Sequence, residues 1–187
     1  MKQLALATLL ALSIHAADPP HATISNGAVT AKFYLPDATN GYYRGTRFDW
    51  SGVIYSLRTA KHEYFGQWFP KYDPILHDAI MGPVEEFKTN GAGLGWEDAK
   101  PGDTFIRIGV GVLRRPDDKT FNAFSYYPIV DPGKWRVRKA KDRITFTHTL
   151  SDEKGSLFNP GTTVPLFVPS GQSSIMVNFR VAAGGKP

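Results

Sequence analysis

The sequence contains no cysteine. This absence excludes disulfide bonds, thiolate nucleophiles and cysteine metal sites. The sequence also lacks the H-E-x-x-H metalloprotease motif, the phosphate-binding P-loop and the G-x-S-x-G nucleophile elbow. We therefore expect neither a metal nor another cofactor, and no motif places the chain among nucleotide-binding proteins or serine hydrolases.

Long helical patterns are scarce, whereas glycine, proline and aromatic residues are frequent. The 187 residues include 18 glycines and 14 prolines, and 13% of them are aromatic. Frequent turns and aromatic residues favour β structure, and the length suits one domain. The fold class that we predict is all-β, an antiparallel β-sandwich.

Residues 1–17 have the pattern of a signal peptide. Lys2 precedes an apolar run of eleven residues, Leu4–Ile14, which is too short to span a bilayer. Ala16 and Ala17 offer small residues for cleavage, so we predict export to the periplasm or the extracellular space, with no transmembrane segment after signal removal. The formal net charge of +5 is small, and an exported protein seldom meets nucleic acid, so we predict no nucleic-acid partner.

The stretch from Gly41 to Ile54, GYYRGTRFDWSGVI, combines aromatic, charged and glycine residues. Read as a strand, it places Tyr43, Gly45, Arg47 and Asp49 on one face, and Tyr42, Arg44, Thr46, Phe48 and Trp50 on the other. Small, charged and aromatic side chains together often line a polar ligand pocket. The alternative is that Arg47 and Asp49 pair with each other or with neighbours on a half-buried strand, and from this stretch alone we favour that alternative.

A second candidate region lies between Lys71 and Phe87, where Pro74 interrupts the strand pattern. His77-Asp78 and Glu85-Glu86 place an imidazole and three carboxylates within ten residues. Loops between strands are where binding sites are usually built. The alternative is that His77 satisfies loop backbone and that one of the two glutamates is solvated.

The remaining pattern predicts several strands. We expect a hairpin at His21–Leu35 with an Asn26-Gly27 turn, strands at Tyr64–Phe69, Thr104–Arg114 and Thr120–Tyr127, a second hairpin at Lys134–Leu150, and a mobile glycine-rich loop at Thr89–Trp96. In the second hairpin His148 lies on the apolar face, which predicts a hydrogen-bonded core histidine. The other face carries Lys134, Arg136, Arg138 and Arg143. This row could contact an acidic glycan, but a solvated strand face that discourages edge pairing is the interpretation we favour.

The composition changes near Gly155. From there to Pro187 the only charged residues are Arg180 and Lys186, and four prolines occur. The pattern predicts an atypical tail, loop-rich or disordered, in which Ser173–Val181 can still form a strand. The predicted organisation is thus a signal peptide (1–17), a β-sandwich domain (18–154) and a tail (155–187).

Four segments, residues 42–54, 64–69, 77–87 and 100–118, together resemble the galactose mutarotase-like group. More narrowly, they are similar to bacterial aldose 1-epimerase-like proteins. The resemblance covers residues 22–152, and RGTRFDWSG (44–52) and GPVEEF (82–87) carry most of its specificity. Residues 155–187 do not resemble the family, so the domain is expected to be an incomplete, N-terminal part of a β-supersandwich.

The resemblance implies a sugar or oligosaccharide partner and anomer interconversion by general acid–base catalysis. The substrate-binding candidates are Arg44, Arg47, Asp49, Trp50, His77, Asp78, Glu85 and Glu86. The catalytic base and acid cannot be assigned, because the family's histidine motifs and C-terminal glutamate find no match here. The alternative function is a non-catalytic carbohydrate-binding module in which Trp50, Trp68 and Trp96 stack on sugar rings. Exposed sheet edges of a partial sandwich also predict oligomerisation.

Overall fold

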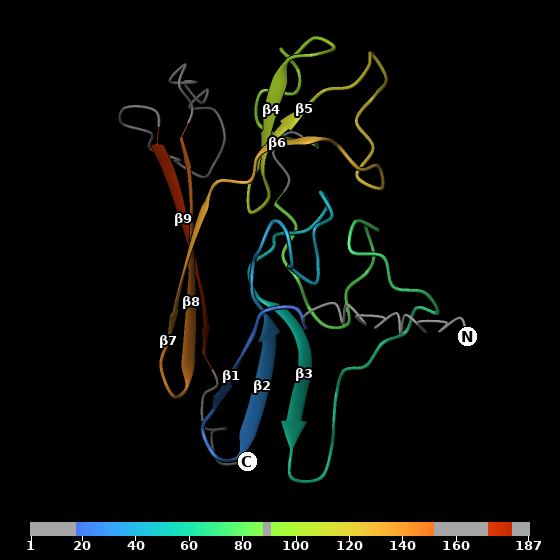
Figure 1. Ribbon diagram of the computed structural model, residues 1–187. Coiled ribbons are helices and arrows are strands. Elements are labelled where there is room, and N and C mark those ends of the chain that lie inside the picture. Colours follow the sequence, from blue (N-terminus) through green and yellow to red (C-terminus); the bar gives the residue numbers. More distant parts are fainter. Residues whose placement is uncertain (1–17, 88–90, 152–171, 181–187) are drawn as a thin grey trace, which may run out of the picture.

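The computed structural model describes residues 18–87, 91–151 and 172–180, and for 172–180 the backbone alone (Figure 1). The described chain is all-β, as predicted, and contains no helix. Its nine strands form three antiparallel sheets of three strands each. The strands are β1 (His21–Ser25), β2 (Val29–Tyr34), β3 (Val53–Thr59), β4 (Thr104–Arg107), β5 (Gly111–Arg114), β6 (Ile129–Asp131), β7 (Lys134–Lys139), β8 (Arg143–Ser151) and β9 (Gln172–Arg180).

The first sheet has the order β1-β2-β3 and begins with the predicted hairpin. The turn lies one residue later than predicted. Asn26 N donates to Val29 O, which leaves Gly27 and Ala28 as the two central residues, and Gly27 adopts a φ of 93°. The Asn26 side chain accepts hydrogen bonds from the backbone N–H groups of Ala28 and Val29, so it organises the turn without occupying its centre.

The third sheet has the order β7-β8-β9 and contains the second predicted hairpin. The last strand, β9, pairs with β8 along nine residues, from Arg143↔Arg180 to Ser151↔Gln172. The possible strand within the predicted tail is therefore confirmed and completes this sheet. The rest of the predicted tail, like the predicted signal peptide, lies outside the described residues.

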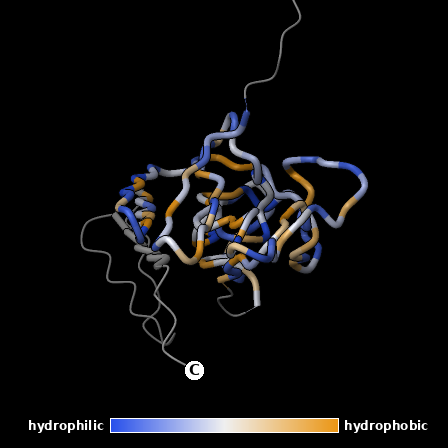
Figure 2. The backbone as a smooth tube through the Cα atoms, turned by 90° about the horizontal axis from the view of Figure 1, so that it is seen from below, coloured by the Kyte–Doolittle hydropathy of each residue, from blue (hydrophilic) through white to orange (hydrophobic). Residues whose placement is uncertain are grey.

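The first and third sheets pack face to face as a small sandwich. Ile24, Ala31 and Phe33 of the first sheet form one apolar cluster with Ile144 and Phe146 of the third. All five side chains are at most 2% exposed. Alternation along β2 and β8 creates this core, because every second residue points inward. In Figure 2, viewed from below, apolar colour is concentrated in the interior.

His148 confirms the prediction of a hydrogen-bonded core histidine. It is 3% exposed, and its Nε2 donates to the carbonyl oxygen of Pro132 at 2.9 Å. Its ring stacks on Trp135, the residue opposite it in the register, at a centroid distance of 4.0 Å.

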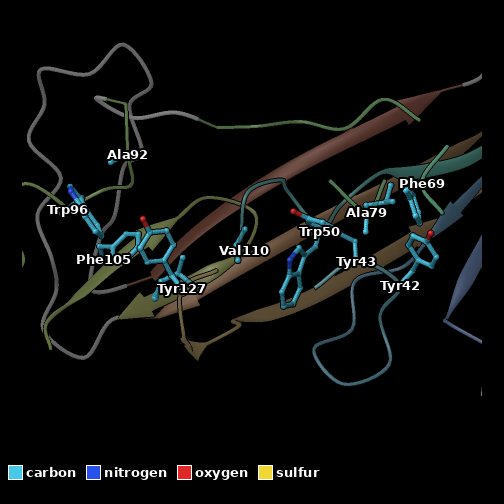
Figure 3. Packing of buried hydrophobic residues seen from close by; sticks show 12 residues of the cluster. Tyr42, Tyr43, Trp50, Phe69, Ala79, Ala92, Trp96, Phe105, Val110 and Tyr127 are labelled. Carbon is cyan, nitrogen blue, oxygen red and sulfur yellow. The ribbon is translucent and has the colours of Figure 1, made fainter. Parts of the chain in front are cut away.

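A second, larger core lies beside the sandwich and is dominated by aromatic rings. Figure 3 shows it extending from Trp96, Phe105 and Tyr127 past Val110 and Trp50 to Tyr42, Tyr43 and Phe69. Three strands, β4 to β6, border one end of it, and irregular segments enclose the rest. Edge-to-face contacts join Trp96 to Phe105 and to Tyr127 at centroid distances of 4.8 and 5.6 Å.

The prediction of a strand from Gly41 onward is wrong for most of its length. Residues 41–52 are irregular, and the strand begins only at Val53. The segment is nevertheless almost continuously buried, and Trp50 and Asp49 are 2% and 1% exposed. The two-residue alternation of its side chains was therefore coincidental, because nearly every position packs inward.

The predicted strand Thr104–Arg114 is a hairpin, β4 and β5, that reverses at residues 108–110. Gly109 makes the reversal possible with a φ of 77°, and a Cβ at this position would lie 2.3 Å from the Asp49 carboxyl carbon. The alternating glycines thus serve a turn and a close approach of two segments.

Three further predictions of local structure need correction. Tyr64–Phe69 and Thr120–Tyr127 are not strands: the first is irregular and ends in a bend at Phe69, and the second contains a turn at 123–125. The described part of the glycine-rich loop, 91–96, is not an overhanging loop: Leu94 and Ile106 exchange two backbone hydrogen bonds, and Ala92 and Trp96 are buried. Residues 88–90 of that loop lie outside the described residues.

Candidate functional site

The candidate site is centred on the guanidinium group of Arg47, which lies between two phenyl rings. Its Cζ is 4.5 Å from the ring centroid of Phe48 and 4.6 Å from that of Phe124. Contact with the two rings restricts the guanidinium group, whose hydrogen-bond donors point outward along its planar edge. The rings therefore fix the plane in which Arg47 can bind carboxylates or a ligand.

Two carboxylates occupy that edge. Arg47 Nη1 donates to Asp78 Oδ1 at 2.5 Å, and Arg47 Nε lies 3.5 Å from Glu86 Oε2. Asp78 is half-exposed, and its other oxygen, Oδ2, lies 3.2 Å from Nε2 of His77. The fold therefore brings together four of the sequence candidates, Arg47, His77, Asp78 and Glu86.

Two contacts hold the imidazole of His77, and a third holds its backbone. Asp78 contacts its Nε2, the ring of Phe124 meets it edge-on at a centroid distance of 5.0 Å, and the His77 carbonyl accepts a hydrogen bond from the Tyr43 hydroxyl. The Nδ1 atom has no hydrogen-bond partner among the described residues, and the side chain is 28% exposed. An oriented, accessible ring nitrogen is suited to exchange a proton or a hydrogen bond with a ligand hydroxyl.

Arg107 supports the site from beneath. It is 1% exposed and donates hydrogen bonds to the backbone carbonyls of Ala92 and Arg47, each at 2.7 Å. Its Nη2 also lies 3.7 Å from Glu86 Oε1. Burial lowers the pKa of Arg107, and the adjacent Glu86 opposes that shift by stabilising the charged form. Arg107 thus fixes both the Arg47 backbone and one of its carboxylate partners.

Asp49 lies below the site surface rather than on it. Ser51 N donates to its Oδ1 at 2.7 Å, its own N–H donates to Glu85 O, and Gly109 packs against the carboxyl group. Its Oδ2 is buried without a hydrogen-bond partner in the described structure. Burial raises the pKa of Asp49 to about 7, and the charge of Glu85 adds to the shift, whereas hydrogen bonds from Ser51 oppose it.

The other sequence candidates lie elsewhere. Trp50 belongs to the aromatic core, with its Nε1 donating to Gly45 O, and neither face of the indole is open. Arg44 donates to Thr39 O and has no described ion pair with the Arg47 cluster. Glu85 is exposed and joins the site through its backbone carbonyl.

Among the three tryptophans that the alternative function invoked, Trp68 alone is accessible. It is 64% exposed, whereas Trp50 and Trp96 are 2% and 5% exposed. Its Nε1 donates a hydrogen bond of 2.7 Å to Ile80 O, which holds the indole in place. Stacking of a ligand on Trp50 or Trp96 is therefore excluded in this structure.

Sequence reasoning missed Phe124 and Arg107. Phe124 is 56% exposed and lies in a segment that was predicted to be a strand. The sequence did contain an indication that Arg107 is buried. It stands two residues after Phe105 in an apolar run, and an arginine in such a position needs buried partners.

The described residues contain no group of three or more histidine or acidic side chains that could hold a metal ion. They also include no helix that is long and apolar enough to cross a membrane. Comparison with protein-family models, curated proteins and solved structures finds no match to this chain.

Proposed function

We propose that the chain is an exported carbohydrate-binding protein and that the surface formed by Arg47, His77, Asp78 and Phe124 binds a sugar. The observation that carries the proposal is the guanidinium of Arg47, stacked between two rings and bonded to Asp78, beside a half-exposed imidazole. Carboxylate, imidazole and guanidinium groups together can donate to and accept from sugar hydroxyls.

The exposed ring of Phe124 supplies the apolar part of the site. A sugar ring carries C–H groups on one face and hydroxyls around its edge, so it fits an aromatic ring beside polar groups. Phe124 contacts both Arg47 and His77, so a sugar against the exposed part of its ring lies beside these polar side chains. The resemblance to the galactose mutarotase-like group supports the same ligand class.

Anomer interconversion is the second candidate function. The His77–Asp78 pair favours it, because a carboxylate that orients an imidazole is suited to general acid–base catalysis. In this reaction one group removes the proton of the anomeric hydroxyl and another protonates the ring oxygen, the ring opens, and it closes on the other face. His77 is the group that we expect to exchange a proton with the sugar.

Binding is tested by nuclear magnetic resonance titration of the protein with galactose, glucose and their disaccharides. We expect Arg47→Ala and Phe124→Ala to weaken binding at least about tenfold. The matched control is Tyr126→Ala, which removes an aromatic ring that is 45% exposed and has no described contact with Arg47. Equal affinity of all four proteins, or no binding by the folded wild type, would refute the proposal.

Polarimetry separates binding from catalysis. Freshly dissolved α-D-glucose and α-D-galactose change optical rotation as their anomers equilibrate. Acceleration by the wild type and its loss in His77→Gln would support anomer interconversion. Binding without acceleration would support the non-catalytic carbohydrate-binding module.

A further inference from the structure

The β7–β8 hairpin holds an uneven share of the charge. Residues 134–143 contain six of the 22 lysines and arginines but one of the 17 acidic residues, Asp142. The rest of the chain therefore has 16 basic and 16 acidic residues, and this hairpin alone carries the formal net charge of +5. Solvation of the protein surface would not require the positive charge to be concentrated in one hairpin.

The register of the hairpin puts most of this charge on one face. The inward residues of β8, among them Ile144, Phe146 and His148, are buried against the first sheet. The alternate residues Lys134, Arg136 and Arg138 of β7 point the other way and are exposed, as is Arg143 at the start of β8. Successive cations on β7 are spaced about 7 Å apart, because side chains on one face recur every second residue.

The surroundings of the cations are polar and uncharged. Lys134, Arg136 and Arg138 stand directly opposite Thr149, Thr147 and Thr145 of β8. No described ion pair engages any of the four basic side chains, whereas Arg47, Arg107 and Lys119 elsewhere in the described structure each have a carboxylate within 4.0 Å. The row is thus not neutralised by the described part of the protein itself.

We infer that this face of the β7–β8 hairpin, called here the basic face (Lys134, Arg136, Arg138 and Arg143), binds an acidic polysaccharide that carries carboxylate or sulfate groups. A straight row of cations matches repeated anionic groups on a linear polymer, and guanidinium groups bind such oxyanions through paired hydrogen bonds. This surface lies on other elements than the Arg47 site, and the inference does not depend on the proposed function.

The same observations argue against two other polyanions. Binding of single-stranded nucleic acid usually uses aromatic rings on which bases stack. The one aromatic residue of β7, Trp135, is turned inward against His148. Attachment to an anionic membrane is strengthened by apolar side chains that enter the lipid, and the described side chains of this face offer only cations and threonines.

The test measures binding of the full chain to immobilised polygalacturonate and dextran sulfate, with neutral dextran as the reference. The face variant is Lys134→Gln/Arg136→Gln/Arg138→Gln. The matched control, Lys61→Gln/Lys71→Gln/Lys100→Gln, removes three exposed cations that lie outside the hairpin, so the net charge falls equally. Thermal melting of both variants verifies that they are folded.

We expect at least one acidic polysaccharide to bind, with an affinity that falls steeply as salt is added. The face variant should lose about tenfold or more in affinity, since each exposed cation contributes modestly, and the control variant should bind like the wild type. Three results would overturn the inference: no binding by the wild type, equal losses in the two variants, or tighter binding to duplex DNA or to phosphatidylserine vesicles than to either polysaccharide.

Discussion

The sandwich and the aromatic region that carries the site are held together in different ways. In the sandwich, long backbone ladders such as β8–β9 satisfy the peptide groups, and aliphatic and phenylalanine side chains fill the core. In the aromatic region, residues 41–52, 60–87 and 91–103 belong to none of the nine strands. Their peptide groups are bound by scattered backbone hydrogen bonds, such as Trp50 N to Gly109 O, and by polar side chains. Irregular backbone can be buried only if its polar groups find such partners.

Several polar side chains provide those partners. Arg107 binds two carbonyls, Arg115 binds the carbonyls of Trp96 and Ala99, and the Trp50 indole binds Gly45 O. Thr46 Oγ1 accepts from Tyr127 N and donates to Ser125 O. The comparison teaches that turn-type backbone hydrogen bonds and polar side chains together take the place of strand pairing in this core.

The largest predicted effect is that of Arg107→Ala. It leaves the carbonyls of Ala92 and Arg47 without their donor, and Glu86 keeps Arg47 but loses the second of its two nearby positive charges. We expect the free energy of unfolding to fall by about 3–5 kcal/mol in denaturant titrations. Arg138→Ala, which removes an exposed arginine from the sandwich, should cost less than about 0.5 kcal/mol. If Arg107→Ala lowers the free energy of unfolding by less than about 1 kcal/mol, the proposed difference between the two regions is wrong.

The two regions should respond to pH in opposite directions. Burial raises the pKa of Asp49 from 3.8 to about 7, so the folded state keeps a proton that the unfolded chain has released. This contribution is complete below pH 3.8 and is lost as the pH rises towards about 7, at a cost on the order of 4 kcal/mol. Burial lowers the pKa of His148 below 6.5, so its contribution is present above pH 6.5 and is lost as the pH falls.

Single variants separate these two pH effects. The measurement is thermal unfolding between about pH 4 and pH 8. Asp49→Asn should remove the loss of stability towards neutral pH, and His148→Gln should remove the loss towards acid. If Asp49→Asn leaves the pH profile of thermal unfolding unchanged, this account of Asp49 is wrong.

A smaller effect is expected for Thr46→Val, which keeps the side-chain shape but removes the hydroxyl. The buried N–H of Tyr127 then loses its acceptor, so the free energy of unfolding should fall by about 1–3 kcal/mol. The control is Thr147→Val on the outer face of β8, where we expect a change within about 0.5 kcal/mol. Equal effects of the two substitutions would show that side-chain hydrogen bonds have no special role in the aromatic region.

The smallest effect on stability is predicted for Phe124→Ala. Phe124 is 56% exposed, so its removal should change the free energy of unfolding by less than about 1 kcal/mol. The same substitution should weaken sugar binding strongly, which distinguishes a binding residue from a structural one. A large loss of stability would instead make Phe124 part of the core.

Much of the sandwich could be predicted from the sequence, because alternation at 29–35 and 134–150 reports one buried face per strand. The aromatic region could not, since alternation carries no information where every side chain packs inward, as at 41–52. Residue chemistry made Arg47, His77, Asp78 and Glu86 candidates, but the sequence did not predict that Arg47 would contact the other three. Phe124 was missed because its contact with Arg47 joins segments far apart in the chain.

The most direct test of the sugar site uses two histidines as reporters, one in each region. Ring proton signals of His77 and His148 are followed by nuclear magnetic resonance while galactose or glucose is added at constant pH. The account predicts saturable shifts of His77, which lies half-exposed beside Phe124, and no shift of His148, which is buried in the sandwich. An unchanged His77 signal, or equal shifts of both histidines, would contradict it.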